Sequence, residues 1–473
     1  MVRTFTKYIL LLLVFAGGCK SFIPRPEHRV LEAGVVPDLF SGSESQTNAV
    51  KSLQLPEHWW QVFGSDELNT LIETAFTNNL DMAAAVARLR QAREQMVIAG
   101  AAGGFFLNGS GGAQVDKNGD TRSGFNVNDT RESYSLGLQA SYEVDIWGRI
   151  SSNERAAELS YAATAEQLNA TALMISGEIT RAWVQYKTAL LEMDLIREQI
   201  GTSEKALELL KVRQRAALSA AVDVYQQESQ VAALERLLPQ LEEQCSDLRI
   251  RLKYLLGSAA SFPLPVKVSA ESLPDVDELP ACGVPADLLV NRPDIRAAWL
   301  ALQSREWSVA SREAERFPTL TLSGSLSFES PEISDVLQNW YANLAAGLVG
   351  PILDGGRRKA EVRLAEAQAD ENFVGYTDAV LLAIQDVEQA LARESSRRKY
   401  LTAVEREITL SDKTLKESAN RYRKGLMEYL NVLTALSAKQ NAERRALAAE
   451  NSLVLNRVAL YQALGGRELR MGN

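Results

Sequence analysis

The chain has 473 residues, enough for two or three domains, and its 46% hydrophobic and 23% charged residues are typical of a folded protein. The formal net charge of −9, with no Lys/Arg block, argues against nucleic-acid binding. Only two histidines occur, His28 and His58, so a histidine metal site or a Ser-His-Asp triad has little support. We therefore expect no metal ion, and no cofactor other than a covalent lipid.

The first eighteen residues have the pattern of a signal peptide that ends at a cysteine. Arg3 and Lys7 lead into the apolar run YILLLLVFA, which is too short to span a membrane, and GGC follows it. This arrangement resembles a bacterial lipoprotein signal, in which the cysteine is acylated and becomes the new N-terminus. We expect residues 1–18 to be removed and Cys19 to carry lipid. The alternative is an ordinary secretory signal with an incidental cysteine.

Residues 19–64 are rich in proline and serine without sustained periodicity, which predicts an extended linker. The Ser65–Asp66 pair can cap a helix that runs to about Gly100. Two strands follow, because apolar and polar residues alternate from Phe105 to Val115 and again from Tyr134 to Ile146. Beyond the signal, no stretch approaches the ~18 apolar residues of a membrane-spanning helix, so a membrane crossing would have to use strands.

Residues 150–257 carry the pattern of a long helical hairpin. Apolar residues recur at spacings of four and three, which is the seam of a coiled coil. The rising arm, from about residue 150 to 217, would be ~100 Å long. The seam positions are Leu168, Ala172, Ile175, Ile179, Ala182, Tyr186, Ala189, Met193, Ile196 and Ile200 in the rising arm, and Leu234, Leu238, Leu241, Cys245, Leu248, Leu252 and Leu255 in the returning arm.

The same pattern occurs a second time, 208 residues further along the chain. WGR at 147–149 corresponds to GGR at 355–357, and LLG at 255–257 corresponds to ALG at 463–465. Another short helix, a strand at 319–328 and a weaker strand, WYANLAAGLVGPI, precede the second hairpin. The fold is therefore predicted as mainly α, a duplicated unit of short helix, two strands and long helical hairpin.

The duplication divides the chain into six predicted parts. They are a signal peptide at 1–18, a lipid-anchored linker at 19–64, a first repeat at 65–257, a connector at 258–283, a second repeat at 284–465 and a tail at 466–473. Besides Cys19, these parts contain two cysteines. Cys245 and Cys282 could pair in an oxidising compartment, but Cys245 occupies a seam position, so two free thiols are favoured.

The strands predict a membrane sheet that one chain cannot complete. About ten residues with one apolar and one polar face is the length that crosses a bilayer at a tilt. Such a sheet cannot leave an open edge in lipid, and four strands are too few for a barrel, whose lower limit is about eight. The hairpins also expose seams that they would not bury alone. Both observations predict an oligomer that shares one barrel.

Several segments together resemble the TolC-like outer-membrane efflux factors, and most nearly their lipid-anchored NodT or OprM-like branch. The resemblance covers essentially the whole mature chain. It rests on LPEHWWQVFGSDELNTLIETAFTNNLDMAAAVARLRQAREQ, LLVNRPDIRAAWLAL, ERFPTLTLSGS, YEVDIWGR, ILDGGRR and RYRKGLMEYLNVLTA.

The resemblance implies a homotrimer with a twelve-stranded outer-membrane barrel, a twelve-helix periplasmic tunnel and a mixed α/β belt that includes the connector. Such proteins reside in the outer membrane of Gram-negative bacteria and extend into the periplasm. They are the passive exit ducts of tripartite pumps, in which a periplasmic adaptor and an inner-membrane transporter, here expected to be of the RND type, deliver the cargo. The expected partners are these proteins and outer-membrane lipid, with no nucleic acid.

The resemblance also implies a gate where the two hairpins turn, around 217–223 and 425–431. In the family, polar and charged contacts between neighbouring hairpins hold this end closed until the adaptor engages. An alternative is that the charges here only finish and cap helices. By matching position, Leu430, Asn431 and Thr434 would face the lumen, Asp223 and Tyr422 would tether neighbouring hairpins, and Arg213, Arg421 and Gly425 belong to the turns.

Two other functions fit parts of the sequence. A structural or adaptor lipoprotein that tethers the envelope through coiled coils would explain the helices and Cys19, but not four strands of membrane-crossing pattern. An enzyme would need a convergent set of catalytic groups, and the sequence offers no catalytic motif. We therefore expect a channel without enzymatic activity.

Overall fold

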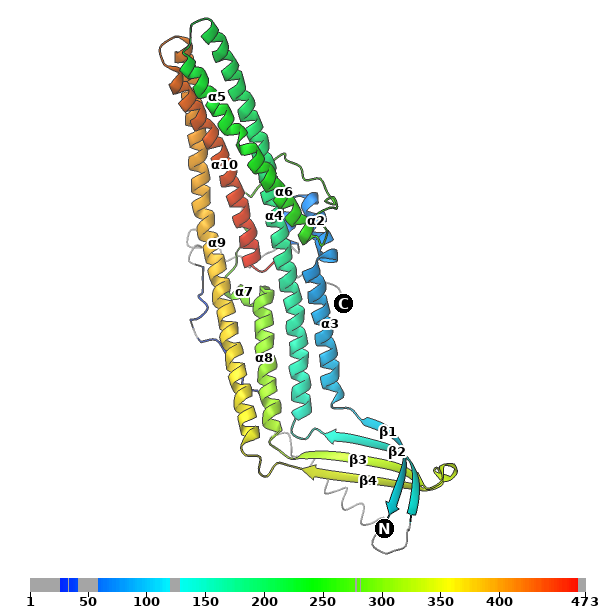
Figure 1. Ribbon diagram of the computed structural model, residues 1–473. Coiled ribbons are helices and arrows are strands. Elements are labelled where there is room, and N and C mark those ends of the chain that lie inside the picture. The colour runs from blue at the N-terminus through cyan, green and yellow to red at the C-terminus, as the bar shows by residue number, and fades with distance from the viewer. Residues whose placement is uncertain are drawn as a thin grey trace. The chain divides into compact units, whose positions relative to one another are not determined.

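The computed structural model describes residues 26–32, 34–40, 58–119, 128–276, 279–280 and 282–466 (Figure 1). The predicted signal peptide, Cys19 and nearly all of the predicted tail lie outside these residues. The chain forms two compact units. The first contains residues 89–164 and 297–376 and the described residues up to 31, and the second contains 32–88, 165–296 and 377 onward. Each sequence repeat therefore contributes to both units.

The elements follow the same order in both repeats, with short 3₁₀ turns (η) between some of them. In the first, η3 (Trp59–Phe63) precedes α2 (Asp66–Asn78), α3 (Leu80–Ala101), β1 (Phe106–Gly119), β2 (Asn128–Val144), α4 (Arg149–Arg215), α5 (Ala221–Glu235) and α6 (Leu237–Leu255). In the second, α7 (Pro285–Asn291) and α8 (Pro293–Ala314) precede β3 (Thr319–Ser330), η4 (Ile333–Asp335), β4 (Trp340–Val349), α9 (Arg357–Arg423) and α10 (Tyr429–Ala463).

The single helix predicted from Ser65 to Gly100 is two helices that separate at Asn79. Ser65 caps α2 as predicted, since its hydroxyl accepts a hydrogen bond from the Leu68 amide at 3.3 Å. Asn79 has an extended backbone, with ψ of 134°, and its side-chain oxygen accepts from the amides of Asp81 and Met82. An asparagine that caps the next helix thus ends the first one, which the apolar periodicity does not reveal.

The end of the predicted linker is packed rather than extended. Residues 59–63 form a 3₁₀ turn in which Trp59 and Trp60 are 2% and 4% exposed. Trp59 stacks on Tyr461 with ring centroids 5.9 Å apart and donates a hydrogen bond to the Ser176 hydroxyl at 3.1 Å. Aromatic rings carry a large apolar area, so this segment belongs to the core of the second unit.

The four strands form one antiparallel sheet in the order β1-β2-β3-β4 (Figure 1). Its register places Leu138 opposite Gly109 and Leu326, on the apolar face, and Gln139 opposite Asn108 and Ser325, on the polar face. The strands predicted at 105–115, 134–146 and 319–328 and the weaker fourth strand are all present. Within the described residues, β1 and β4 each leave one edge unpaired, which agrees with a sheet completed by other copies.

The first unit also contains the helical segments next to the sheet and the N-terminal residues 26–31. Ser304 on α8 donates a hydrogen bond to the Ala156 carbonyl of α4 at 2.7 Å, and Trp299 lies 5.3 Å from the Tyr376 ring of α9. The carboxylate of Glu306, which is 1% exposed, accepts hydrogen bonds from His28 Nδ1 and the Arg29 amide, both at 2.7 Å. These bonds fasten the N-terminal segment to α8.

The helical hairpins repeat with the predicted offset. α4 and α9 each have 67 residues, and each begins and ends with arginine. The returning arms differ, because α10 is continuous over 35 residues whereas Arg236 separates α5 from α6. Pro239 explains the difference, since it has no N–H to donate to the carbonyl four residues earlier, and the second copy has no proline there.

The predicted seam is the core of the hairpins. Among its residues, Ala172, Ile179, Ile196 and Leu252 are at most 1% exposed. Cys245 packs in the same cluster as Met193 and Leu241. Both Cys245 and Cys282 are free thiols, as favoured from the sequence, and burial raises the pKa of each, that of Cys282 to about 11.

A buried ion pair joins α9 to α10 in the second unit. The side chains of Glu394 and Arg457 are 2% and 1% exposed and lie 2.6 Å apart. Asn456 also donates to Glu394, at 2.9 Å, and Arg457 donates to the Val276 carbonyl of the connector at 3.0 Å. Arg398 adds a bond to the same carbonyl at 2.7 Å, so this cluster holds the connector against both helices.

Candidate functional site

The ends of the two hairpins lie side by side in the second unit (Figure 1). Both turns have the same hydrogen bonds, because the Leu218 amide donates to the Arg213 carbonyl at 2.8 Å and the Leu426 amide donates to the Arg421 carbonyl at 3.0 Å. This is the Schellman ending of a helix, which needs a left-handed residue. Gly425 takes that position with φ of 73° and Ala217 with φ of 56°.

Replacing Ala217 with Gly is expected to stabilise the first hairpin by about 0.5–1 kcal/mol. Left-handed backbone costs an L-residue ~1–2 kcal/mol, and the larger conformational entropy of glycine in the unfolded state offsets part of the gain from removing that cost. The reverse change, Gly425→Ala, should destabilise the second hairpin by a similar amount. Melting of the purified trimer in detergent measures both. A lower melting temperature for Ala217→Gly would mean that the alanine methyl group makes a contact worth more than the strain.

A chain of three side chains links the first hairpin to the second. The Arg213 guanidinium of α4 lies 4.9 Å from the ring centre of Tyr422 on α9, within cation–π distance. It also donates a hydrogen bond to the Leu218 carbonyl at 3.4 Å, within its own turn. The Tyr422 ring in turn meets the Tyr429 ring at 5.4 Å and 63°, an edge-to-face arrangement.

Tyr429 of the second hairpin also contacts the first hairpin, through a hydrogen bond. It is 5% exposed at the start of α10, and its hydroxyl donates to Gln227 Oε1 of α5 at 2.7 Å. Burial, together with the nearby Tyr422 and Asp223, raises the pKa of Tyr429 to about 12, so the phenol stays a neutral donor. We call Arg213, Tyr422, Tyr429 and Gln227 the hairpin lock.

A buried amide layer lies further along the same helices. Gln227 donates to the Ser203 carbonyl at 2.8 Å, and Gln440 donates to the Ser203 hydroxyl at 3.1 Å. Gln199 donates to the Gln440 carbonyl at 3.1 Å. Buried amides that are fully hydrogen-bonded fix one register between helices, whereas a slip would leave them unpaired at about 1–3 kcal/mol each. The layer therefore holds the two hairpins in register behind the lock.

The structure places the predicted site residues in four different settings. Arg213 and Tyr422 meet in the lock, whereas Asp223 accepts hydrogen bonds from the Ser219 hydroxyl at 2.8 Å and the Ala220 amide at 3.2 Å, which cap its own helix α5. Arg421 pairs with Glu417 one turn earlier, at 2.7 Å, and both are exposed. The remaining residues, Leu430, Asn431 and Thr434, lie exposed on α10 beyond the Gly425 turn.

Two polar atoms of the lock have no hydrogen-bond partner among the described residues. They are the Tyr422 hydroxyl and Arg213 Nε, both inaccessible to solvent. Buried polar groups usually find partners, but these two atoms are covered by the chain itself, so a neighbouring copy reaches them only if the side chains of the lock move. A tether through Tyr422 to a neighbouring copy therefore stays a prediction, while Arg421 and Asp223 make their contacts at their own helices.

The sequence reasoning missed Tyr429, Gln227 and the amide layer. A comparison of the two copies at the 208-residue offset could have found Tyr429, because the matching position in the first copy is Ala221. Tyr422 likewise corresponds to Gln214. Aromatic residues present in only one copy mark contacts that the duplication does not require.

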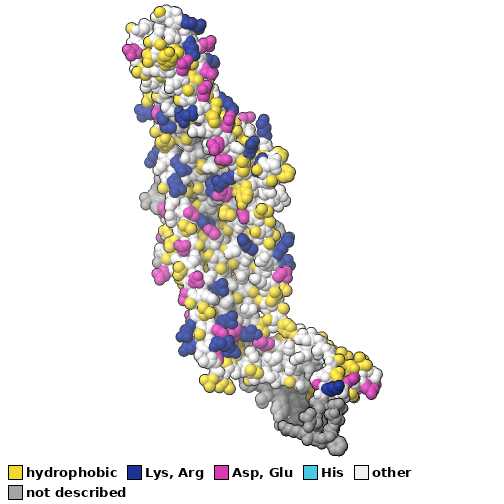
Figure 2. Space-filling view, viewed as in Figure 1, with side chains coloured by type: hydrophobic (Ala, Val, Ile, Leu, Met, Phe, Trp, Pro, Cys, Tyr) yellow, Lys and Arg dark blue, Asp and Glu magenta, His cyan; other side chains and the backbone are white. Residues whose placement is uncertain are grey.

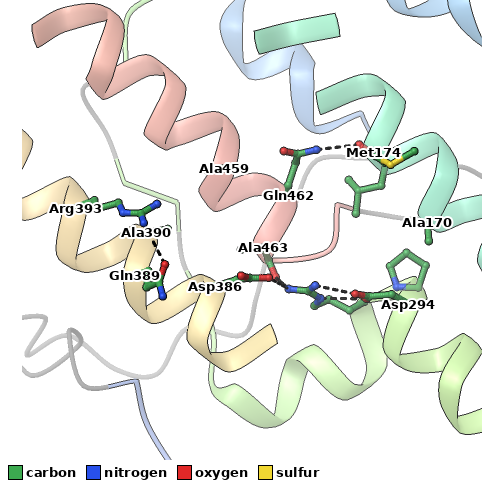
Figure 3. Close-up of a pocket in the computed structure, with 13 residues that line it drawn as sticks. Ala170, Met174, Asp294, Asp386, Gln389, Ala390, Arg393, Ala459, Gln462 and Ala463 are labelled. Carbon is green, nitrogen blue, oxygen red and sulfur yellow. Dashed lines mark hydrogen bonds and ion pairs between the residues drawn. The ribbon is translucent and has the colours of Figure 1, made fainter. Parts of the chain in front are cut away.

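A second candidate site is a pocket of 330 Å³ in the second unit (Figure 3). Asp294 and Asp386 converge on the Arg292 guanidinium, at 2.7 and 3.3 Å, and Arg292 also donates to the Ala463 carbonyl at 3.0 Å. The Gln462 amide donates to the Leu173 carbonyl at 3.2 Å. These polar groups satisfy one another, so we assign the pocket a structural role as a clamp between α8, α9 and α10.

Two further properties of the described residues bear on function. Across the described residues, no cluster of three or more His, Cys, Asp or Glu side chains is arranged to hold a metal ion. Nor does any helix in this part of the chain combine the length and apolar character needed to span a membrane.

Comparison with known proteins identifies the class. The outer membrane efflux protein family matches residues 71–258 and 284–466. The pyoverdine export outer membrane protein OpmQ of Pseudomonas putida is 32% identical to this chain over 92% of both chains. The probable outer membrane lipoprotein SilC of Salmonella typhimurium is 26% identical over 95% of this chain and 96% of its own length. The solved structure of the outer-membrane channel OprN superposes with a TM-score of 0.85 at 27% identity, over 93% of this chain and 98% of that one.

The fold and these matches define an outer-membrane channel of an efflux pump. The chain belongs to the outer membrane efflux protein family. It forms homotrimers in which the strands make one outer-membrane barrel and the helical hairpins a periplasmic tunnel, and it works with a periplasmic adaptor and an inner-membrane pump component. A tether built only on coiled coils would leave the two-faced sheet without a role.

Proposed function

We propose that this channel is the duct of a tripartite pump with an RND-type transporter, that the hairpin ends close it at rest, and that it catalyses no reaction. The hairpin lock supports the closure, because it joins both hairpins of one chain through the Arg213–Tyr422 contact and the Tyr429–Gln227 hydrogen bond. The exposed face of α10 with Leu430, Asn431 and Thr434 would then line the narrow end.

The energies of the lock suit a gate that can be opened. A partly buried cation–π pair contributes ~0.5–2 kcal/mol, an aromatic pair ~0.5–1.5 kcal/mol and a hydrogen bond about 1 kcal/mol. Their sum of roughly 2–4 kcal/mol per chain keeps a detached hairpin at about 0.1–3%, since ~1.4 kcal/mol corresponds to a tenfold change. An adaptor that binds the open form better needs only this difference to shift the population.

The pump class is tested by identifying the proteins in contact with the channel. Affinity capture of the tagged trimer from cross-linked cells of its own organism, followed by mass spectrometry, should recover an adaptor and an RND-type transporter. The untagged strain serves as the control. Recovery of a transporter of another class with the adaptor would contradict the RND assignment and leave the channel function intact.

We also propose that Cys19 carries the lipid of a lipoprotein. The name of the relative SilC supports this, as do the signal pattern and the Cys19 position. Two or more acyl chains anchor stably at ~0.8 kcal/mol per buried CH₂, whereas one chain binds only reversibly.

Replacing Cys19 with Ser should therefore abolish incorporation of labelled palmitate. With a standard signal supplied, part of the variant should still reach the outer membrane, because the shared barrel also inserts. The Cys282→Ser variant is the matched control and should label normally. Palmitate label that persists in the Cys19→Ser variant would place acylation elsewhere.

A further inference from the structure

The polar face of the sheet carries three consecutive rows of side chains without a charge. The register aligns four residues in each row, one from each strand. The rows are Phe106, Ser141, Ser323 and Ala345; then Asn108, Gln139, Ser325 and Asn343; then Ser110, Gly137, Ser327 and Tyr341. At two residues per row, the three rows extend over about 20 Å of strand, a large part of the ~30 Å hydrocarbon thickness.

Charged residues border this neutral band on both sides. On the side of the helices lies Glu143, which is held by two hydrogen bonds from Arg149 at 3.1 and 2.8 Å. On the other side lie Glu329, aligned with Ser135, and the cross-strand pair Asp116 and Arg131. Two of the three acidic residues therefore have a cationic neighbour, which limits their field inside the band.

The opposite face fixes which side meets lipid. Its residues include large apolar side chains that are exposed within one chain, such as Leu107 at 62%, Trp340 at 67% and Leu344 at 91%. Lipid accepts an apolar face, so in the trimer this face is turned outward and the polar face lines the lumen. The surface of the helices differs from this apolar face, because Figure 2 shows Lys/Arg and Asp/Glu side chains interspersed over it.

We infer that the barrel lumen is an uncharged band of carboxamides and hydroxyls that admits hydrophilic solutes of either charge, so that the barrel does not select cargo by charge. This inference rests on the channel function described above. The central row supplies three carboxamides and one hydroxyl per chain, from Asn108, Gln139, Asn343 and Ser325. Each of these groups both donates and accepts hydrogen bonds, so the band solvates anions and cations alike, whereas rings of one charge select.

Local charge in the lumen is measured with a cysteine at Ser325. Native membranes are treated from outside with methanethiosulfonate reagents, one cationic (ethyltrimethylammonium) and one anionic (sulfonatoethyl), and the two modification rates are divided by those of a free thiol. We expect Ser325→Cys to react with both, and the corrected rates to agree within about threefold. A lumen at a potential of several kT would separate them by on the order of 100-fold.

Three controls make the result decisive. The wild-type chain gives the background from Cys245 and Cys282, and Leu326→Cys, the next residue on the lipid face, should react with neither reagent. Adding Asn343→Asp beside the Ser325→Cys thiol should favour the cationic reagent at least several-fold, which shows that the assay detects one charge. A rate ratio above about tenfold in Ser325→Cys alone would overturn the neutral lumen. The assignment of the faces would be overturned if the Ser325→Cys thiol reacts with neither reagent, or if the Leu326→Cys thiol reacts instead. The channel function itself is tested separately, by ion conductance.

Discussion

Replacing Tyr422 with Leu is expected to raise the resting conductance of the trimer several-fold while the trimer stays assembled. The substitution removes the ring on which Arg213 lies at 4.9 Å and which meets Tyr429 at 5.4 Å. The loss of about 1–3 kcal/mol per chain would raise the population of the detached second hairpin roughly fivefold or more. Leucine keeps an apolar side chain against the buried cluster of Leu210, Val224 and Tyr429, so the local core should persist.

The conservative change Tyr422→Phe separates two ways of closing the gate. Phenylalanine keeps the ring contacts within the chain and loses only the hydroxyl, which has no partner among the described residues. If closure rests on the lock alone, Tyr422→Phe should behave as wild type. If the hydroxyl bonds a neighbouring copy, Tyr422→Phe should also raise conductance, and more so when combined with Asp223→Ala.

Single-channel recording in planar bilayers measures these effects on purified trimers. Tyr400→Leu is the matched control, because it makes the same change on the same helix at a tyrosine that is 51% exposed. Electrophoresis without heating verifies that each variant is a trimer. An intact Tyr422→Leu trimer with wild-type conductance would show that the closure lies outside the lock.

The sequence predicts the elements of this protein well because their patterns are local. Alternation of period two gives all four strands, and spacings of four and three give the hairpin seams. The 208-residue offset also places the turns, since Gly425 identifies the left-handed residue of the second turn and its counterpart Ala217 has the same conformation despite its methyl group. The polar face of the sheet is likewise readable before any register is known.

The contacts between elements are not readable in the same way. Arg213 and Tyr422 are 209 positions apart, and neither pattern nor propensity indicates that a helix-ending arginine lies on an aromatic ring. Asp223 shows the opposite case, because its position at the start of a helix predicted the cap that it forms. The sequence places Trp59 in a linker because a single turn of 3₁₀ helix has no periodicity to detect.

The Glu394–Arg457 pair is the contact whose loss should cost most stability. Replacing Arg457 with Met leaves Glu394 buried with two partners among the described residues, Asn456 and Arg398, at 2.9 and 3.1 Å. Removing one member of a buried pair typically costs ~3–5 kcal/mol, and we expect about 3 kcal/mol here because those two partners remain. The double variant Arg457→Met with Glu394→Met should recover most of this loss, since two apolar side chains need no partner.

Melting of the trimer in detergent measures the effect, at one protein concentration for all variants because assembly makes the midpoint concentration-dependent. Arg445→Met is the matched control: it removes an arginine from the same helix, but its pair with Glu407 is 43% and 47% exposed, so the expected loss is below about 1 kcal/mol. Arg457 also donates to the Val276 carbonyl, so Arg457→Met should make the connector more sensitive to proteolysis than Arg445→Met does. Equal melting temperatures for the two variants would mean that water or a rearranged Arg398 neutralises Glu394, and the cluster would then be a surface network rather than a buried pair.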